Sequence, residues 1–175
     1  MALFAALPAA AAQQEPDLEN TLYMDLKDGR VVIRLRPDLA PVTVARIKEL
    51  TRRHFYDGIV FHRVIAGFMA QTGDPTGTGA GGSDLPDLKA EFTRKAKHVR
   101  GTVSMARTSD PDSANSQFFI VYEPAPWLDG QYTIFGEVTE GMEHVDAIKK
   151  GAGEDGMVRD PDRIIRMQVA ADAQD

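Results

Sequence analysis

The most unusual chemistry in this sequence lies in residues 55–75, which read FYDGIVFHRVIAGFMAQTGDP. Alternation predicts a strand over Ile59–Ile65, in which Arg63 shares a face with Phe61 and Ile65. A guanidinium among apolar side chains is costly unless a partner or a ligand engages it. Two interpretations stay open: Arg63 forms an ion pair beside an aromatic core, or it borders a surface pocket of Phe and Met side chains.

Two later clusters supply further aromatic and amide groups. Residues 116–120 read SQFFI, and residues 125–130 read APWLDG, which contains the only Trp of the chain. They have the same two interpretations, because they either belong to the core or add apolar rings and amides to a pocket beside the cation.

Other kinds of chemistry have little support in the sequence. The chain has no Cys, which excludes disulfides, thiolate zinc sites, iron–sulfur clusters and cysteine nucleophiles. It has no Gly-x-Ser-x-Gly motif, so nucleophilic hydrolysis is disfavoured. Residues 77–82 match G-x-G-x-x-G as text, but the turn sequence SDLPD follows them where a nucleotide site needs a helix. We expect a flexible loop beside a surface groove.

The four His residues, at positions 54, 62, 98 and 144, contain no i, i+4 pair. For His62 we expect a structural side chain with satisfied hydrogen bonds, which faces away from Phe61 and Arg63, and not a metal ligand or general base. The Asp-Pro-Asp pairs at 110–112 and 160–162 suit turns better than calcium sites. We expect no metal and no cofactor.

Short strands dominate the elements that must position these residues. We expect eight strands, over residues 21–26, 30–36, 59–65, 68–72, 102–106, 117–122, 133–138 and 163–170, with an Asp-Gly turn between the first two. One helix is entered through Pro41, and a second runs from Met142 to a stop at Gly151. This pattern favours a closed eight-stranded antiparallel β-barrel capped by two α-helices over a β-sandwich, because closure removes exposed edges.

Length and composition indicate one folded domain. The chain has 175 residues, of which 43% are hydrophobic, and a net charge of −6. A chain of this length buries enough surface to fold without disulfides or a structural metal. The negative charge argues against binding to nucleic acid or to an anionic membrane surface.

Residues 1–12, MALFAALPAAAA, resemble the end of a secretory signal. Ala10 and Ala12 satisfy an A-x-A cleavage pattern, although no basic region precedes them, and a disordered Ala-rich tail is the alternative. The stretch is too short to span a bilayer. We expect residues 13–19 to form a linker, 20–171 a domain and 172–175 a frayed tail. The expected location is the periplasm, or the cytoplasm if residues 1–12 are not a signal.

Three segments carry a resemblance to a known family. Residues 55–82, residues 104–120 (SMARTSDPDSANSQFFI) and residues 127–138 (WLDGQYTIFGEV) resemble, in order and spacing, the signature segments of the cyclophilins. The similarity runs from about residue 20 to residue 170. It implies the same eight-stranded barrel with two helices, an active groove on its outer face, and cis–trans isomerisation of X-Pro peptide bonds in protein substrates, which assists folding.

The resemblance also implies roles for individual residues. Arg63 is the catalytic residue, whose guanidinium hydrogen-bonds the prolyl nitrogen of the twisted amide, and Gln71 helps to hold the substrate carbonyl. The remaining substrate-binding residues form the proline pocket, hold the peptide backbone or shape the rim: Phe68, Met69, Ala106, Arg107, Gln117, Phe119, Trp127, Leu128 and Tyr132.

Two of these positions depart from the familiar family pattern. Arg107 stands where Asn is usual, and Tyr132 stands where His is usual. Tyr132 keeps an aromatic body and a hydrogen-bonding tip, so we expect an altered sequence preference with retained activity. The loop before Gln117 is about one residue longer than usual. An indole at Trp127 resembles the type that binds cyclosporin, so we expect this inhibitor to act on the protein.

The expected partners are proline-containing peptides and unfolded proteins, bound by a monomer with no nucleic acid and no membrane span. The rival hypothesis is a non-catalytic proline-segment binding module or chaperone that uses the same groove. A pure binder has no need for the guanidinium of Arg63, so the sequence favours the enzyme. A structural protein has little support, because the chain has no repeats and no coiled-coil heptads.

Overall fold

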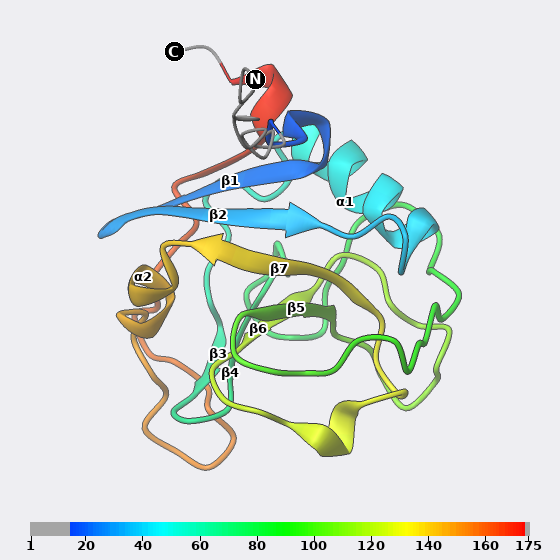
Figure 1. Ribbon diagram of the computed structural model, residues 1–175. Coiled ribbons are helices and arrows are strands. Elements are labelled where there is room, and N and C mark those ends of the chain that lie inside the picture. Colours follow the sequence, from blue (N-terminus) through cyan, green and yellow to red (C-terminus); the bar gives the residue numbers. More distant parts are fainter. Residues whose placement is uncertain (1–14, 174–175) are drawn as a thin grey trace, which may run out of the picture.

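The computed structural model describes residues 15–173 and forms one antiparallel sheet beside two α-helices (Figure 1). The strand order is β3-β4-β6-β5-β7-β2-β1-β8. In chain order the strands are β1 (Thr21–Leu26), β2 (Gly29–Leu35), β3 (Arg63–Ile65), β4 (Met69–Thr72), β5 (Thr102–Met105), β6 (Phe118–Val121), β7 (Ile134–Glu140) and β8 (Arg166–Val169). Helix α1 (Pro41–Arg52) packs against β8, and α2 (Met142–Asp146) packs against β2.

The sheet is an open half-barrel, so the predicted closed barrel is wrong. Its end strands β3 and β8 pair only with β4 and β1, respectively. Residues 156–164 lie across this gap and bond to residues 58–64 through isolated bridges such as Val60 with Arg163. A regular ladder cannot continue there, because Pro161 has no N–H to donate and Asp160 has a φ of 51°.

Most predicted elements are present, but several are shorter than predicted. Strand β1 and the start of α1 at Pro41 agree with the prediction, whereas the strand predicted over 59–65 is reduced to the three residues of β3. The strand predicted over 163–170 is reduced to β8. Helix α2 ends at Asp146 and not near Gly151, because the Lys149 N–H donates to the Asp162 carboxylate at 2.9 Å instead of to a helical carbonyl.

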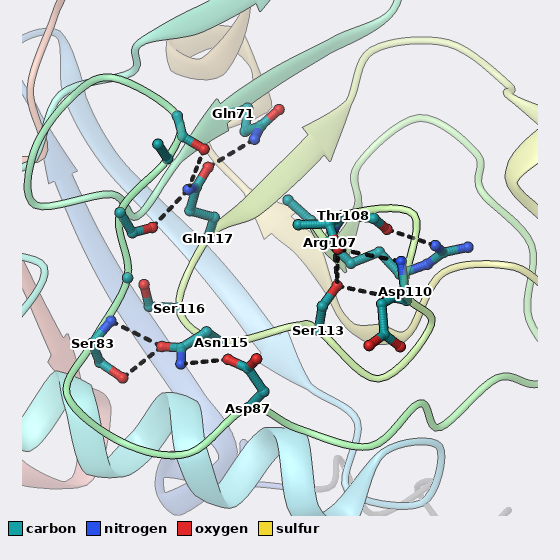
Figure 2. A pocket seen from close by; sticks show the side chains of 15 residues that line it. Gln71, Ser83, Asp87, Arg107, Thr108, Asp110, Ser113, Asn115, Ser116 and Gln117 are labelled. Atoms are coloured by element: carbon teal, nitrogen blue, oxygen red, sulfur yellow. Dashed lines mark hydrogen bonds between the residues drawn. The ribbon is translucent and has the colours of Figure 1, made fainter.

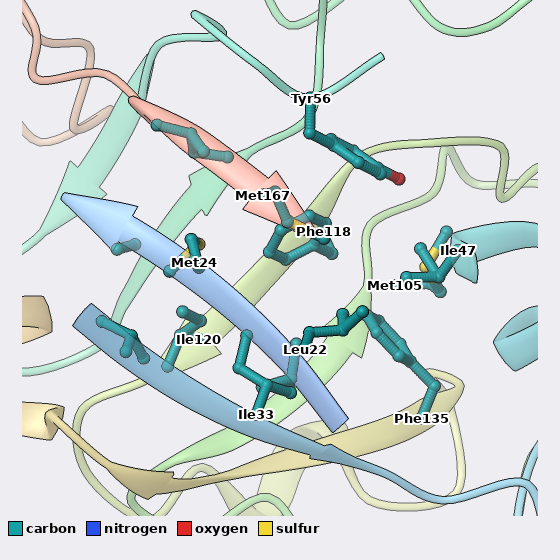
Figure 3. Packing of buried hydrophobic residues seen from close by; sticks show 14 of the residues in the cluster. Leu22, Met24, Ile33, Ile47, Tyr56, Met105, Phe118, Ile120, Phe135 and Met167 are labelled. Carbon is teal, nitrogen blue, oxygen red and sulfur yellow. The ribbon is translucent and has the colours of Figure 1, made fainter. Parts of the chain in front are cut away.

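The hydrophobic core fills the concave side of the sheet and is closed by α1 (Figure 3). The side chain of Ile47 on α1 is completely buried against this core. Tyr56 lies in the same core and satisfies its hydroxyl by donating to the Ser116 carbonyl at 2.8 Å. Figure 3 labels ten members of the cluster, namely Leu22, Met24, Ile33, Ile47, Tyr56, Met105, Phe118, Ile120, Phe135 and Met167.

Both ends of the described chain are attached to α1. Glu19, in the predicted linker, forms an ion pair with Lys48 at 2.7 Å, and Asp172, in the predicted frayed tail, accepts a hydrogen bond from Arg52 Nε at 2.9 Å. Surface ion pairs therefore attach Glu19 and Asp172 to α1, although about half of each side chain stays exposed. The predicted signal, residues 1–12, lies outside the described residues. Within residues 15–173, no helix has the length and apolar character needed to cross a bilayer.

Candidate active site

Strand register assembles the site on the outer face of the sheet. Arg63 of β3 pairs with Gln71 of β4, and Gln71 pairs with Phe119 of β6. Directly opposed residues in neighbouring strands share a face, so these three side chains form a row. The alternating residues Val64 and Ala70 point to the other face and belong to the core. The sheet therefore separates the site from the core by a single layer.

This row borders a pocket of about 370 Å³, which we call the apolar pocket. It is lined by eight of the eleven residues that the resemblance implies, namely Arg63, Phe68, Met69, Gln71, Ala106, Arg107, Phe119 and Tyr132. Gln117 lines a neighbouring pocket. Trp127 and Leu128 line neither of these two pockets.

Neutral acceptors hold the Arg63 guanidinium. Its Nε donates to the backbone carbonyl of Asp155 at 2.9 Å, and its Nη1 donates to Gln71 Oε1 at 3.3 Å. It forms no ion pair with any carboxylate of residues 15–173. The ion-pair interpretation of Arg63 is therefore wrong, and the cation keeps its charge available at the rim of the pocket.

Stacked rings form the floor of the apolar pocket. Phe119 lies edge-to-face with Tyr132 at 5.8 Å between centroids, and the imidazole of His98 stacks on Phe119 at 6.1 Å. His98 is buried and both of its ring nitrogens have partners, Asp129 Oδ1 at 3.0 Å and Ser104 Oγ at 2.9 Å. Burial lowers the pKa of His98, and the neighbouring Asp129 opposes this shift. His98 thus supports the floor as a structural residue.

Leu128 and Trp127 support the pocket without lining it. Leu128 is buried in the same apolar cluster as Met69 and Phe119. Trp127 is 61% exposed and its ring lies 5.6 Å from that of Phe68. The indole therefore extends the apolar surface outward from Phe68.

The two unusual residues of the groove contact each other. The guanidinium of Arg107 lies 4.6 Å from the ring centroid of Tyr132 and 5.6 Å from that of Phe92. Its Nε and Nη2 also donate to the Gln131 carbonyl, at 3.0 and 2.8 Å. Arg107 and Tyr132 therefore form one cation–π unit, in which each residue fixes the position of the other.

A second, polar pocket of about 580 Å³ adjoins the first (Figure 2). It shares Gln71 and Arg107 with the apolar pocket, so the two form one continuous groove. Gln117 lies between them: its Oε1 accepts from Gln71 Nε2 at 2.9 Å, and its Nε2 donates to the carbonyls of Gly79 and Gly81 at 3.0 and 2.8 Å. Gln117 therefore connects the row on the sheet with residues 77–82, which we call the Gly-rich loop.

The Gly-rich loop folds around a buried carboxylate. Asp74 is 1% exposed and accepts hydrogen bonds from the backbone N–H groups of Gly79 and Gly81 at 2.6 and 3.1 Å. Burial acts to raise the pKa of Asp74, but the Thr76 hydroxyl and the backbone N–H groups of Gly81, Thr76 and Gly79 outweigh it and lower this pKa to about 2. The loop binds its own carboxylate, and these hydrogen bonds fix a loop that the sequence predicted to be flexible.

His62 departs from the sequence prediction in two ways. It lines the apolar pocket together with Arg63, whereas Phe61 is completely buried in the core. The alternation fails here because β3 begins only at Arg63. The imidazole is 2% exposed, and within residues 15–173 neither of its ring nitrogens has a hydrogen-bond partner. Burial lowers the pKa of His62, which favours the neutral ring.

Sequence reasoning missed the contribution of the segment before β8. Met157 lines the apolar pocket and is 43% exposed. It forms an isolated β-bridge with Arg63, from which it is separated by more than half of the chain. No local pattern around Met157 indicates this position, because only the tertiary structure brings the two segments together. Among the described residues, no group of three or more His, Asp or Glu side chains is placed to hold a metal ion.

The Asp74 carboxylate gives a prediction on stability. Its pKa is lowered in the folded state, so its contribution to stability is present above the unfolded pKa of 3.8 and is lost as pH falls from about 4 to about 2. Asp74→Asn should therefore lower the free energy of unfolding at pH 7, and the difference from the parent protein should shrink towards pH 2. Urea unfolding at both pH values measures this. The same difference in unfolding free energy at both pH values would contradict a lowered pKa of Asp74. Asp84→Asn, at an exposed carboxylate, is the control.

Comparisons with known proteins agree with this geometry. Residues 21–169 match the family model described as cyclophilin type peptidyl-prolyl cis-trans isomerase/CLD. A probable peptidyl-prolyl cis-trans isomerase of Brucella suis is 51% identical over 187 residues, covering 99% of this chain and 95% of the relative. The peptidyl-prolyl cis-trans isomerase-like 1 protein of Aspergillus oryzae is 42% identical, covering 90% of this chain and 100% of the relative.

Solved structures give the same result. A Cryptosporidium parvum cyclophilin, crystallised in the presence of the dipeptide Ala-Pro, is 30% identical with a TM-score of 0.79, covering 85% of this chain and 98% of that one. A cyclophilin of Hirschia baltica is 28% identical with a TM-score of 0.80, covering 90% and 76%. With the family model matched over 21–169, the chain belongs to the cyclophilin-type peptidyl-prolyl cis–trans isomerases.

Proposed function

We propose that this isomerase rotates X-Pro bonds in its apolar pocket, with Arg63 as the catalytic residue. The observation that carries this proposal is a guanidinium at the edge of apolar rings, held by two neutral acceptors. Rotation about an X-Pro bond breaks amide resonance, with a barrier of about 18–20 kcal/mol, and leaves a lone pair on the prolyl nitrogen. An N–H of Arg63 donates to this nitrogen and so favours the twisted amide over both planar forms.

The rest of the groove positions the substrate. Phe68, Met69 and Phe119 immobilise the proline ring, which lets the preceding carbonyl rotate against a fixed partner. An acceleration of about 10⁶-fold requires about 8 kcal/mol of differential stabilisation. A charge-assisted hydrogen bond to Arg63 supplies a few kcal/mol of this stabilisation, and positioning of the substrate supplies the rest.

The proposed substrates are proline-containing segments of unfolded proteins, bound by a monomer. Arg107 lines both halves of the groove and Tyr132 lines the apolar half, so the Arg107–Tyr132 unit contacts residues beside the proline and alters the preference among them. The rival function, proline-segment binding without turnover, uses the same apolar surface but gives Arg63 no task.

Arg63→Ala distinguishes these functions. We expect kcat/KM for a short Ala-Pro peptide to fall about a hundredfold to a thousandfold, because the donor to the prolyl nitrogen is lost, while peptide binding persists. A low-temperature cis-to-trans assay measures the rate, and calorimetry measures binding. Arg166→Ala, on the exposed face of β8, is the matched control. Equal rates for Arg63→Ala and the parent protein would remove the catalytic role of Arg63, whereas no acceleration by the folded parent protein would leave only the binding function.

We also propose export to the periplasm, supported by the apolar, Ala-rich segment before Gln13. Mass spectrometry of periplasmic extracts from the source bacterium should find a mature chain that starts at Gln13. A cytoplasmic chain that retains residues 1–12 would refute the signal and would place the enzyme in the cytoplasm.

Cyclosporin inhibition is a further proposal, and it is based on Trp127. The indole is exposed and backed by Phe68, so its face and its N–H are available to a large apolar ligand. Cyclosporin should inhibit the parent protein, and Trp127→Phe, which keeps an aromatic ring but loses the indole N–H, should raise the inhibitory concentration about tenfold. The isomerase assay with added cyclosporin measures this, and full activity at saturating inhibitor would contradict the proposal.

A further inference from the structure

The segment 151–158 is bonded to the backbone on both sides of the catalytic residue. Val158 N–H donates to the His62 carbonyl at 3.0 Å, and Val64 N–H donates to the Gly156 carbonyl at 2.8 Å. The segment thus lies along the edge of β3 opposite to β4 and replaces the strand that a closed barrel would have there. Its bonds fix the backbone from which the guanidinium extends.

The same segment fixes the guanidinium directly. Arg63 Nε donates to the Asp155 carbonyl at 2.9 Å, while Nη1 donates to Gln71 Oε1 at 3.3 Å. The guanidinium is planar, so two bonds from different nitrogens determine its plane. Without the Asp155 carbonyl, the group can rotate about the bonds of its flexible stem. The remaining N–H groups then no longer point in one direction.

The turn that presents this carbonyl has little freedom. Gly156 has a φ of 73°, and a Cβ at this position would lie 2.4 Å from Ile65 Cγ1. The Asp155 side chain also fixes the turn, because its Oδ1 accepts from the Met157 N–H at 3.0 Å. Glycine is therefore required for the close approach of the turn to β3, and the Asp155 carboxylate directs the backbone at the point where it meets Arg63.

We propose that the 151–158 segment is the positioning element of the Arg63 guanidinium, with Asp155 and Gly156 as its positioning residues. This inference depends on the proposed catalytic function of Arg63. Neither residue contacts the substrate in this proposal, so both act through the orientation of the guanidinium. Their loss lowers kcat much more than it raises KM, because Phe68, Met69 and Phe119, which hold the proline ring, lie outside the segment.

The first test separates geometry from charge at Asp155. Asp155→Ala removes the acceptor for the Met157 N–H, and we expect kcat to fall about threefold to tenfold with KM within about twofold of the parent value. Asp155→Asn loses the same charge but keeps a side-chain carbonyl, so it should restore most of kcat. An Asn variant as slow as the Ala variant would show that charge, and not the turn, is responsible.

The second test uses a double-mutant cycle with Arg63→Ala. If the segment acts through the guanidinium, Asp155→Ala and Gly156→Ala should have no further effect on the rate once Arg63 is truncated. The same fold loss in both backgrounds would overturn the proposal. The Arg63 Nε–H resonance in a ¹⁵N-correlated spectrum provides a readout without turnover. It should shift in each single variant, because the hydrogen bond to the Asp155 carbonyl is weakened.

Gly156→Ala should have the larger effect, about tenfold to a hundredfold on kcat, because it displaces the whole turn from β3. Gly58→Ala is its control, since Gly58 has a similar φ of 80° but no atom within 4 Å of an added Cβ. Circular dichroism verifies that each variant folds. If Gly156→Ala does not fold, Asp155→Ala alone tests the proposal.

The outcomes distinguish the two proposals. Full activity of Arg63→Ala would remove the catalytic function of Arg63 and the positioning proposal with it. A slow Arg63→Ala together with full kcat in folded Asp155→Ala and Gly156→Ala would overturn only the positioning proposal.

Discussion

The site depends on one constraint: a guanidinium must be held in a fixed orientation without being neutralised. A carboxylate would hold Arg63 more strongly, but its negative charge would compete with the weak lone pair of a twisted amide nitrogen. The structure uses an amide oxygen of Gln71 and a backbone carbonyl of Asp155 instead. Both acceptors orient the cation through hydrogen bonds and leave its net charge uncompensated within the described residues.

The sheet makes this arrangement possible because it has two faces with different tasks. The register that opposes Arg63 to Gln71 and Gln71 to Phe119 fixes the outer row, while the intervening residues anchor the strands in the core. A shift of one residue in β4 would exchange the two faces. The apolar packing of Val64 and Ala70 therefore specifies the position of the site, although neither residue contacts it.

Local sequence patterns predicted what depends on near neighbours. The hairpin of β1 and β2 and the helix from Pro41 follow from alternation and turn chemistry. Most residues that line the apolar pocket were instead named through the family resemblance. The predictions of a closed barrel and of a His62 side chain that faces away from Arg63 were wrong. Both depend on the segment 156–164, which pairs with residues 58–64 only through isolated bridges, so that no regular strand forms there. The partner of Arg63 Nε is 92 residues away, at Asp155, and no spacing rule connects such distant segments.

The amides of the groove form a directed chain that ends at the catalytic cation. The carbonyls of the Gly-rich loop accept from Gln117 Nε2, Gln117 Oε1 accepts from Gln71 Nε2, and Gln71 Oε1 accepts from Arg63. Each amide therefore turns its negative end towards Arg63, and reversing either one would place two donors or two acceptors together. The loop in turn is fixed by the Asp74 carboxylate. A charge buried beneath the loop thus helps to keep a row of neutral dipoles aligned towards the guanidinium.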